Sequence, residues 1–237
     1  MADPGLTPRF AIETVWKQFG RRPVLRNASV WAYPGAVTVL FGRNGEGKST
    51  LLRCGLGLLR SDVGVTILGD RRHHRPSLAR LAWEGLFFLP DRDLFSPQLT
   101  VAAQVRALVA RFPEAAPARL ERIVPEPGLL DRHSWELSGG ERRRAEVGYA
   151  GARGPTVLVA DEPLRGLAPL DAQVVAGALR TLAAEGCAVL VTGHEARALL
   201  DVADHVVWMT GGTTHHLGPR DVALAHDQFR SNYLRYI

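Results

Sequence analysis

The chain has 237 residues, of which 46% are apolar and 22% charged. This length fits one large domain, or one domain with a small satellite, and the composition excludes a disordered or fibrous chain. The two cysteines are too few for a disulfide scaffold, so we expect a packed core in a reducing compartment. No apolar run approaches the ~20 residues that span a bilayer, and the first residues lack the pattern of a signal peptide. The sequence therefore predicts a soluble, intracellular protein.

The net charge of +5 comes from 29 basic and 24 acidic residues. A basic balance is compatible with nucleic acid, an anionic membrane surface or a phosphorylated ligand. Only Lys17 and Lys48 are lysines and the other 27 basic residues are arginines, a bias that we attribute to genome composition. In such a chain a lysine is informative, because it marks a place that needs a compact ammonium rather than a guanidinium fork.

Strand-like and helical segments alternate along the chain. We expect strands at residues 9–16, 24–31, 36–41, 63–68, 86–89, 156–160, 188–192 and 205–209. Residues 100–154 have helical spacing and predict a helical lobe inserted into the sheet domain. Helices at 170–185 and 196–202 separate the last strands, an alternation typical of parallel strands with right-handed crossovers. The tail, 219–237, predicts one or two short surface helices.

A phosphate-binding loop follows the apolar strand at 36–41. The segment from Gly42 to Ser49 fits G-x-x-x-x-G-K-[ST] and leads into a helix, which is the context that this motif requires. Its glycines let backbone N–H groups point at phosphate oxygens, and the helix N-terminus adds partial positive charge. We expect Lys48 to contact the β- and γ-phosphates, Ser49 to ligate Mg²⁺ and Thr50 to support the start of the helix.

Two acidic residues end the strand at 156–160. Asp161 is suited to hold Mg²⁺ through its waters, and Glu162 to polarise an attacking water. An acidic strand end alone is a weak signal, but with Lys48 it becomes strong.

Between these two motifs lies Leu137-Ser-Gly-Gly-Glu141, followed by three arginines at 142–144. Ser138 and the free N–H groups at a helix N-terminus form a possible anion site. Taken alone, this segment is better explained as a capped helix with a solvated basic first turn.

In order and spacing, these three segments and His194 resemble the ATP-binding domain of ABC transporters, over about residues 9–224. The resemblance implies an α/β P-loop fold with a mostly parallel core sheet, an N-terminal antiparallel β subdomain and an inserted helical subdomain at about 91–154. It also implies a Mg²⁺-dependent ATPase that forms a head-to-tail dimer, in which the Ser-Gly-Gly helix of one subunit covers the ATP on the phosphate loop of the other.

The resemblance also assigns roles to single residues. Phe19 stands where the family places a ring against adenine, although a core aromatic beside a turn is the alternative, and His194 matches the histidine that contacts the γ-phosphate. The implied catalytic residues are Lys48, Glu162 and His194. The implied metal ligands are Ser49, Asp161 and Asp91. The implied nucleotide-binding residues are Phe19, Gly42, Asn44, Gly45, Gly47, Lys48, Ser49, Thr50, Ser138, Gly139 and Gly140.

The chain departs from the family pattern at two positions. Asp91 stands where the family usually has glutamine, so we expect a retained link to the metal with altered coupling. Ala168 stands where an aspartate is common, and since alanine cannot accept a side-chain hydrogen bond, we expect weaker cooperation between two ATP sites. A heterodimer whose other member restores the missing group is the alternative.

The leading hypothesis is therefore the cytoplasmic ATPase subunit of a transporter, held on the inner face of the membrane by a separate transmembrane permease subunit. A weaker similarity points to the lipopolysaccharide-export and branched-chain amino-acid ATPases. The alternatives are a soluble ABC ATPase of the iron–sulfur-assembly type and a binding-only switch with little turnover. We expect no nucleic-acid partner, because no aromatic-lined basic groove is evident. We also expect no metal site at the histidine pairs 73–74 and 215–216, which the sequence places on loops.

Overall fold

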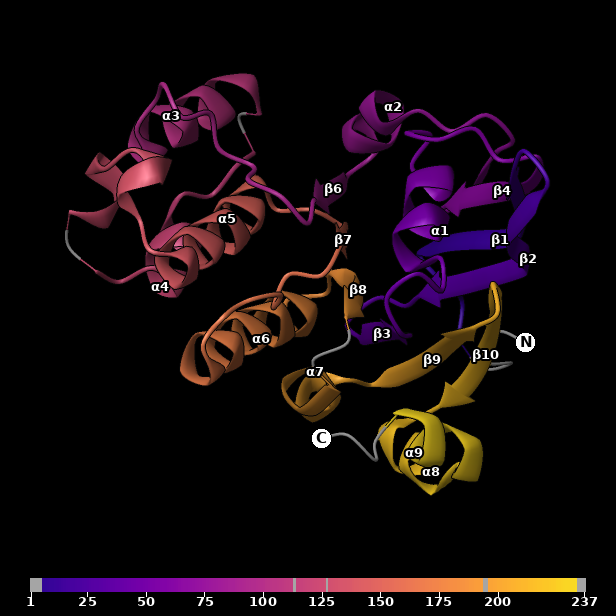
Figure 1. Cartoon of the computed structure of the whole chain (residues 1–237). Coiled ribbons are helices and arrows are strands. Elements are labelled where there is room, and N and C mark those ends of the chain that lie inside the picture. Colours follow the sequence, from indigo (N-terminus) through magenta and orange to yellow (C-terminus); the bar gives the residue numbers. More distant parts are fainter. Residues whose placement is uncertain (1–5, 113, 127, 194–195, 234–237) are drawn as a thin grey trace.

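The computed structural model describes residues 6–112, 114–126, 128–193 and 196–233. A four-stranded antiparallel sheet lies at one side of the molecule, in the order β2-β1-β4-β5 (Figure 1). Its strands are β1 (Phe10–Phe19), β2 (Arg22–Ala32), β4 (Val63–Leu68) and β5 (Arg71–His73).

A six-stranded sheet has the order β10-β9-β3-β8-β7-β6. Its strands are β3 (Val37–Phe41), β6 (Leu86–Leu89), β7 (Val157–Ala160), β8 (Ala188–Gly193), β9 (His205–Thr210) and β10 (Thr213–Gly218). All neighbours pair in parallel except β10, which is antiparallel to β9. Because the carboxyl ends of parallel strands meet at one edge, the segments that follow β3, β7 and β8 converge there.

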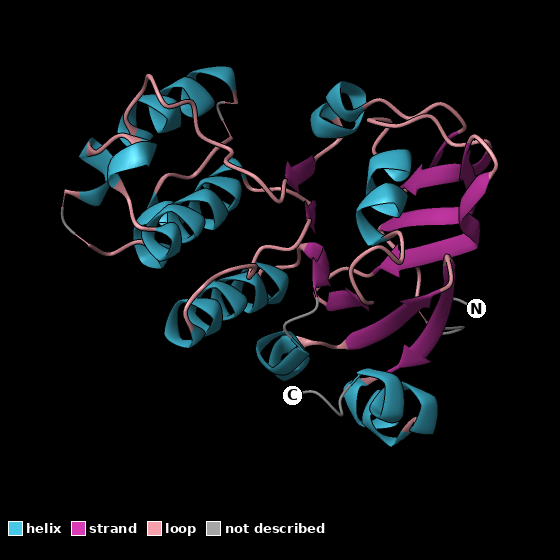
Figure 2. Cartoon of the chain, in the orientation of Figure 1, coloured by secondary structure: helices cyan, strands magenta, loops and turns pink. Residues whose placement is uncertain are grey.

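Helices cover this sheet and form a separate lobe (Figure 2). Those near the sheets are α1 (Lys48–Gly55), α2 (Leu78–Trp83), α6 (Pro169–Ala184), α7 (Ala196–Val202), α8 (Arg220–Ala225) and α9 (Asp227–Tyr233). The helical lobe contains α3 (Val101–Arg111), α4 (Ala118–Ile123) and α5 (Gly139–Arg153), with short 3₁₀ turns at Leu129–Asp131 and Ser134–Glu136.

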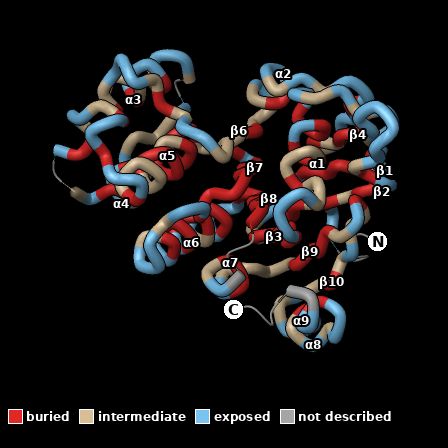
Figure 3. The backbone as a smooth tube through the Cα atoms, in the orientation of Figure 1, coloured by how far each residue is buried: buried red, intermediate tan, exposed pale blue. Residues whose placement is uncertain are grey.

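Buried apolar side chains form one cluster on each face of the parallel sheet and a third inside the helical lobe. Strands β3, β7 and β8 are buried throughout, as Figure 3 shows, because both of their faces are covered. Helix α1 lies between the two sheets, where Leu51 and Leu52 are fully buried. Each such side chain contributes about 1.5–3 kcal/mol, so the start of α1 is held firmly beside β3.

The predicted α/β P-loop fold is confirmed. The strands predicted at 9–16 and 24–31 extend to Phe10–Phe19 and Arg22–Ala32, and two short helices occupy the tail as predicted. Strands β5 and β10 were not predicted. The placement of the histidine pairs on loops is correct for His74 but wrong for His73, which ends β5, and for His215 and His216, which lie within β10. Among the described residues no cluster of metal-ligating side chains is present, and no helix is long and apolar enough to cross a membrane.

Candidate functional site

The loop between β3 and α1 leaves no room for a side chain at Gly42 or Gly47. A Cβ on Gly42 would lie 2.9 Å from the carbonyl oxygen of Met209, and one on Gly47 would lie 2.9 Å from Leu25 Cδ2. Gly45 and Gly47 also have φ values of +86° and +108°, which side chains rarely adopt. The glycines of the motif are therefore required by the path of the chain, and they expose the loop's N–H groups.

Lys48, the first residue of α1, folds back over this loop. Its Nζ donates to the carbonyl of Gly42 at 2.8 Å and to that of Arg43 at 3.3 Å. The ammonium also lies 3.3 Å from Oε1 of Glu162, and both side chains are more than nine-tenths buried. A buried cation and a buried carboxylate thus face each other at the mouth of the phosphate loop.

Asp161 receives hydroxyl hydrogen bonds from two different elements. Ser49 Oγ, in the first turn of α1, donates to Oδ1 at 3.0 Å, and Thr192 Oγ1, at the end of β8, donates to the same oxygen at 2.7 Å. The other oxygen, Oδ2, is buried and has no hydrogen-bond partner among the described residues. Burial raises the pKa of Asp161, and the negative charges of Asp91 and Glu162 add to this rise.

This arrangement fits a divalent cation. A buried carboxylate oxygen without a donor and a serine hydroxyl beside it are hard oxygen ligands of the kind that Mg²⁺ prefers. A bound cation would stabilise the ionised form of Asp161, which burial and the charges of Asp91 and Glu162 disfavour.

Glu162 has an unusual backbone conformation. Its φ of +46° lies in the left-handed region, which is uncommon for a residue with a side chain. Its N–H donates to Thr192 Oγ1 at 2.9 Å. Thr192 therefore accepts from the backbone of Glu162 and donates to Asp161, so a single hydroxyl fixes the positions of both carboxylates relative to each other.

Asp91 lies in the loop that leads from β6 into the helical lobe. Its carboxylate is 3.8 Å from Arg53 Nη2 on α1, a partly exposed pair that contributes little on its own. Helix α5 holds this loop on both sides of Asp91. Arg143 Nη1 donates to the carbonyl of Pro90 at 3.0 Å, and Leu94 N donates to Glu146 Oε1 at 2.9 Å.

Ser138 is the N-cap of α5. Its Oγ accepts from Glu141 N at 3.2 Å, and Glu141 Oε2 accepts from Ser138 N at 2.8 Å, which gives a complete capping box. Ser138 and Gly139 are exposed, and a Cβ on Gly139 would meet nothing within 4 Å. The structure does not bring this helix start to Lys48, because α5 lies in the helical lobe and α1 lies between the sheets (Figure 1).

The remaining predicted residues have simpler surroundings. Phe19 ends β1 and is 49% exposed, so it is not a core aromatic, and Lys17 Nζ lies 5.3 Å from the centre of its ring. Asn44 is exposed on the loop, and Thr50 lies half-buried in the first turn of α1. Ala168 is the N-cap of α6 and provides no side-chain cap. His194 lies outside the described residues.

Sequence reasoning missed Thr192, the Arg143–Glu146 pair and Asp171. The carboxylate of Asp171, in the first turn of α6, packs against Gly140 so closely that a Cβ there would lie 2.2 Å from it. A threonine that ends an apolar strand and a basic–acidic pair at i, i+3 are common patterns, so neither signals a role by itself. The contacts of these residues can be recognised only from the three-dimensional arrangement of the strands and helices.

The sequence model of the ABC transporter family matches residues 25–165. The lipopolysaccharide export system ATP-binding protein LptB of Acidithiobacillus ferridurans is 31% identical over 228 residues, which cover 94% of this chain and 95% of the relative. The octopine permease ATP-binding protein P of Rhizobium radiobacter is 31% identical, in an alignment that covers 94% of each chain.

Solved structures agree on the fold. A crystal structure of an ABC transporter's ATP-binding cassette in its ADP conformation superposes with a TM-score of 0.83 at 24% identity, over 97% of this chain and 99% of that one. A nucleotide-free cassette gives a TM-score of 0.82 at 24% identity, over 98% and 99%. The chain belongs to the ABC transporter family and carries its ATP-binding, ATP-hydrolysing domain.

Proposed function

We propose that the chain hydrolyses ATP with Mg²⁺ as the ATP-binding subunit of a transporter, that it works as a head-to-tail dimer and that a separate membrane-spanning subunit is its partner. The observation that supports this chemistry is the cluster of Lys48, Ser49, Asp161, Glu162 and Thr192 at the carboxyl edge of the parallel sheet, in which every side chain but that of Ser49 is buried. Phosphoryl transfer needs positioned positive charge and an oriented water, and this cluster has groups suited to both.

The phosphates bind to the N–H groups between Gly42 and Gly47 and to the Lys48 ammonium. Mg²⁺ supplies charge neutralisation on the phosphate oxygens, and Ser49 and Asp161 are the residues that would hold it, with Asp91 nearby. We expect Phe19 to stack on the adenine, and the 49% exposure of its side chain supports this role.

Glu162 is the group suited to orient and deprotonate the attacking water. In the structure its carboxylate is paired with the Lys48 ammonium. A phosphate group that recruits Lys48 removes this pairing, which makes the carboxylate more accessible to a water when ATP is bound. The hydrogen bond from Glu162 N to Thr192 holds the left-handed backbone of Glu162, and this backbone sets the position from which the carboxylate side chain extends.

The head-to-tail dimer is supported by the positions of the two anion-binding features. The phosphate loop and the Ser138–Gly139 helix start lie in different lobes of one chain, so a second copy can bring its helix start to the loop. Gly139 has open space where a phosphate would approach. In this arrangement each ATP lies between two subunits.

The partner is supported by the relatives. The matches to a lipopolysaccharide export protein and to an octopine permease protein each extend over nearly the full length of an ATP-binding protein, which is the role that we propose here. Such a subunit lies at the cytoplasmic face of the membrane through its permease. A nucleic-acid role has less support because many arginines pair with carboxylates, for example Arg122 with Glu185 and Arg144 with Glu126.

Phosphate release from ATP tests the chemistry. We expect turnover that requires Mg²⁺ and that Glu162→Gln abolishes while ATP binding persists. ATP binding by Glu162→Gln combined with full turnover would show that Glu162 is not the base.

Mixing two inactive variants tests the dimer. Lys48→Ala disables the phosphate loop, and Ser138→Arg blocks the helix start. A mixed head-to-tail dimer keeps one intact site, formed by the loop of the Ser138→Arg subunit and the helix start of the Lys48→Ala subunit. Random pairing makes half of the dimers mixed. A one-to-one mixture should therefore recover about a quarter of the wild-type sites. No recovery above the sum of the separate variants would contradict a site shared between subunits.

Recovery of membrane proteins tests the partner. The Glu162→Gln chain with ATP, used as bait in detergent-solubilised membranes of the native host, should recover a multi-span protein in stoichiometric amount. Recovery of soluble proteins alone would favour the assembly-motor alternative.

A further inference from the structure

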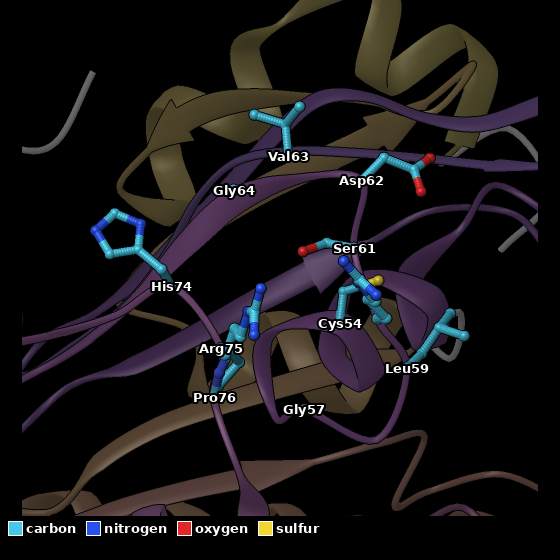
Figure 4. Close-up of a pocket in the computed structure, with 11 residues that line it drawn as sticks. Cys54, Gly57, Leu59, Ser61, Asp62, Val63, Gly64, His74, Arg75 and Pro76 are labelled. Carbon is cyan, nitrogen blue, oxygen red and sulfur yellow. The ribbon is translucent and has the colours of Figure 1, made fainter.

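A cavity of 390 Å³ lies at the C-terminal end of α1, between the turn that leads into β4 and the loop that leads from β5 into α2 (Figure 4). Helix α1 has eight residues, which separates its two ends by about 12 Å. Lys48 and Ser49 lie at the opposite end. The cavity is therefore distinct from the phosphate loop, and no role described above uses it.

Close backbone contacts fix the walls of the cavity. A Cβ on Gly57 would lie 2.0 Å from the carbonyl oxygen of Pro76, so the two segments that form the cavity touch each other. A Cβ on Gly64 would lie 2.9 Å from Val15 Cγ2 on the neighbouring strand. Both glycines have positive φ values, +72° and +133°. The backbone at these two glycines therefore has little freedom to move. The cavity is preorganised, which lowers the entropic cost of binding a ligand.

The side chains of the cavity carry excess positive charge. Its charged lining residues are two arginines, Arg60 and Arg75, and one carboxylate, Asp62, and His74 also lines it. Asp62 is already engaged, since its Oδ1 lies 3.3 Å from Lys17 Nζ and its Oδ2 accepts from Gln18 N at 2.8 Å.

The hydrogen bond from Gln18 is the main cause that holds the pKa of Asp62 below its usual value, so this carboxylate stays ionised beside Lys17. Within the described part of the chain, no carboxylate forms an ion pair with Arg75 or His74. In Figure 4 the Arg75 side chain points toward Ser61, across the cavity. An anion placed there would meet a guanidinium that has no acidic partner among these residues.

The helix end does not oppose an anion. Free carbonyl groups at a helix C-terminus normally repel negative charge. Here the carbonyl of Leu52 accepts from Leu56 N at 2.8 Å, and that of Cys54 accepts from Gly57 N at 3.1 Å. The carbonyl of Arg53 accepts from the next two amides of the turn, at 2.9 and 3.0 Å. These carbonyl oxygens therefore already accept hydrogen bonds from backbone donors.

We propose that this cavity binds a small molecule that carries a phosphate monoester group. Guanidinium groups match phosphate oxygens in a two-pronged geometry, and a doubly charged anion suits two arginines better than a single carboxylate does. The volume falls within the range of small-molecule sites and exceeds the needs of a bare phosphate. Leu59, Val63 and Pro76 offer apolar contact for the rest of the ligand. The phosphate belongs either to a soluble metabolite or to a lipid headgroup.

Calorimetric titration with glycerol 3-phosphate tests the site. The full chain is first saturated with Mg²⁺ and a non-hydrolysable ATP analogue, so that the phosphate loop does not contribute. We expect millimolar or tighter binding that Arg75→Gln weakens at least tenfold. Ser61→Phe fills the cavity without changing its charge and should weaken binding similarly. Arg106→Gln, which removes an exposed arginine on α3, is the matched control and should bind as the wild type does.

Flotation with phosphatidic acid vesicles, against phosphatidylcholine vesicles, distinguishes the two sources. Binding to glycerol 3-phosphate in solution indicates a metabolite, and binding to phosphatidic acid vesicles alone indicates a lipid headgroup. In either case Arg75→Gln must weaken binding more than Arg106→Gln does. Absence of binding to both probes, or equal binding by all variants, would overturn the proposal. None of these results depends on ATP hydrolysis, so the proposed function stands or falls separately.

Discussion

Replacement of Thr192 by valine removes one hydroxyl and nearly conserves the shape of the side chain. In the structure this fully buried hydroxyl donates to Asp161 Oδ1 and accepts from Glu162 N. The loss leaves a buried N–H without its acceptor, which costs about 1–3 kcal/mol. For a chain of this size, 2 kcal/mol lowers the melting temperature by about 4–8 °C.

The same substitution should lower turnover more than it lowers ATP affinity. Glu162 holds a φ of +46°, and without its acceptor its backbone can relax toward a commoner conformation. A shift of about 1 Å in a catalytic group can reduce the rate by about 100-fold, so we expect kcat to fall by about 10- to 100-fold. Thr192 contacts neither Lys48 nor the loop glycines in any hydrogen bond described above, so ATP binding should change by less than about threefold.

Thermal unfolding and phosphate release on three variants check this reasoning. Thr38→Val makes the same chemical change on the adjacent strand β3, where the buried Oγ1 has no hydrogen-bond partner among the described residues, and it should leave stability unchanged or raise it. Thr192→Ser keeps the hydroxyl and should retain most of the turnover. Wild-type kcat in Thr192→Val would refute the positioning role, and equal loss of stability in both valine variants would attribute the effect to shape alone.

Three further predictions concern single residues. Gly42→Ala should lower the affinity for an ATP analogue at least about tenfold in a binding titration, because its Cβ would lie 2.9 Å from a backbone oxygen that cannot move aside; wild-type affinity would contradict the tight loop. Phe19→Ala should weaken ATP binding by about 5- to 150-fold and Phe19→Tyr should not, and equal binding by both would exclude stacking. Asp91→Gln should change the Mg²⁺ concentration that gives half-maximal turnover, and unchanged Mg²⁺ dependence with unchanged turnover would exclude a metal-linked role.

The phosphate loop and the acidic strand end could be predicted because their signals are local. Gly42 and Gly47 are set by the path of a few residues between an apolar strand and a helix, and Asp161 directly follows its own strand. Strand β10 had a local signal as well. Gly211 and Gly212 both have positive φ and form the turn from β9, the pattern of a tight hairpin, but the histidines that follow obscured the strand.

The remaining parts of the site depend on contacts between segments far apart in the chain. Thr192 meets Asp161 across 31 positions, and Glu146 meets the amide of Leu94 across 52. Nothing in the residues around Glu146 distinguishes a solvated i, i+3 pair with Arg143 from the buried pair that the structure contains. Burial raises the pKa of Glu146, a sign that its charge is held inside the protein rather than at its surface.

The contacts of Arg143 and Glu146 restrain the loop that carries Asp91. Arg143 and Glu146 hold the residues on either side of it, Pro90 and Leu94, through hydrogen bonds to charged side chains that are each worth about 1.5–3 kcal/mol. A displacement of Asp91 relative to the metal position must therefore move α5 with it or break these bonds. Because Ser138 is the N-cap of α5, these hydrogen bonds link the loop around position 91 to the helix start. In the metal site that we propose, an aspartate where the family usually has glutamine would change what contacts the metal, while the hydrogen bonds between this loop and α5 would remain.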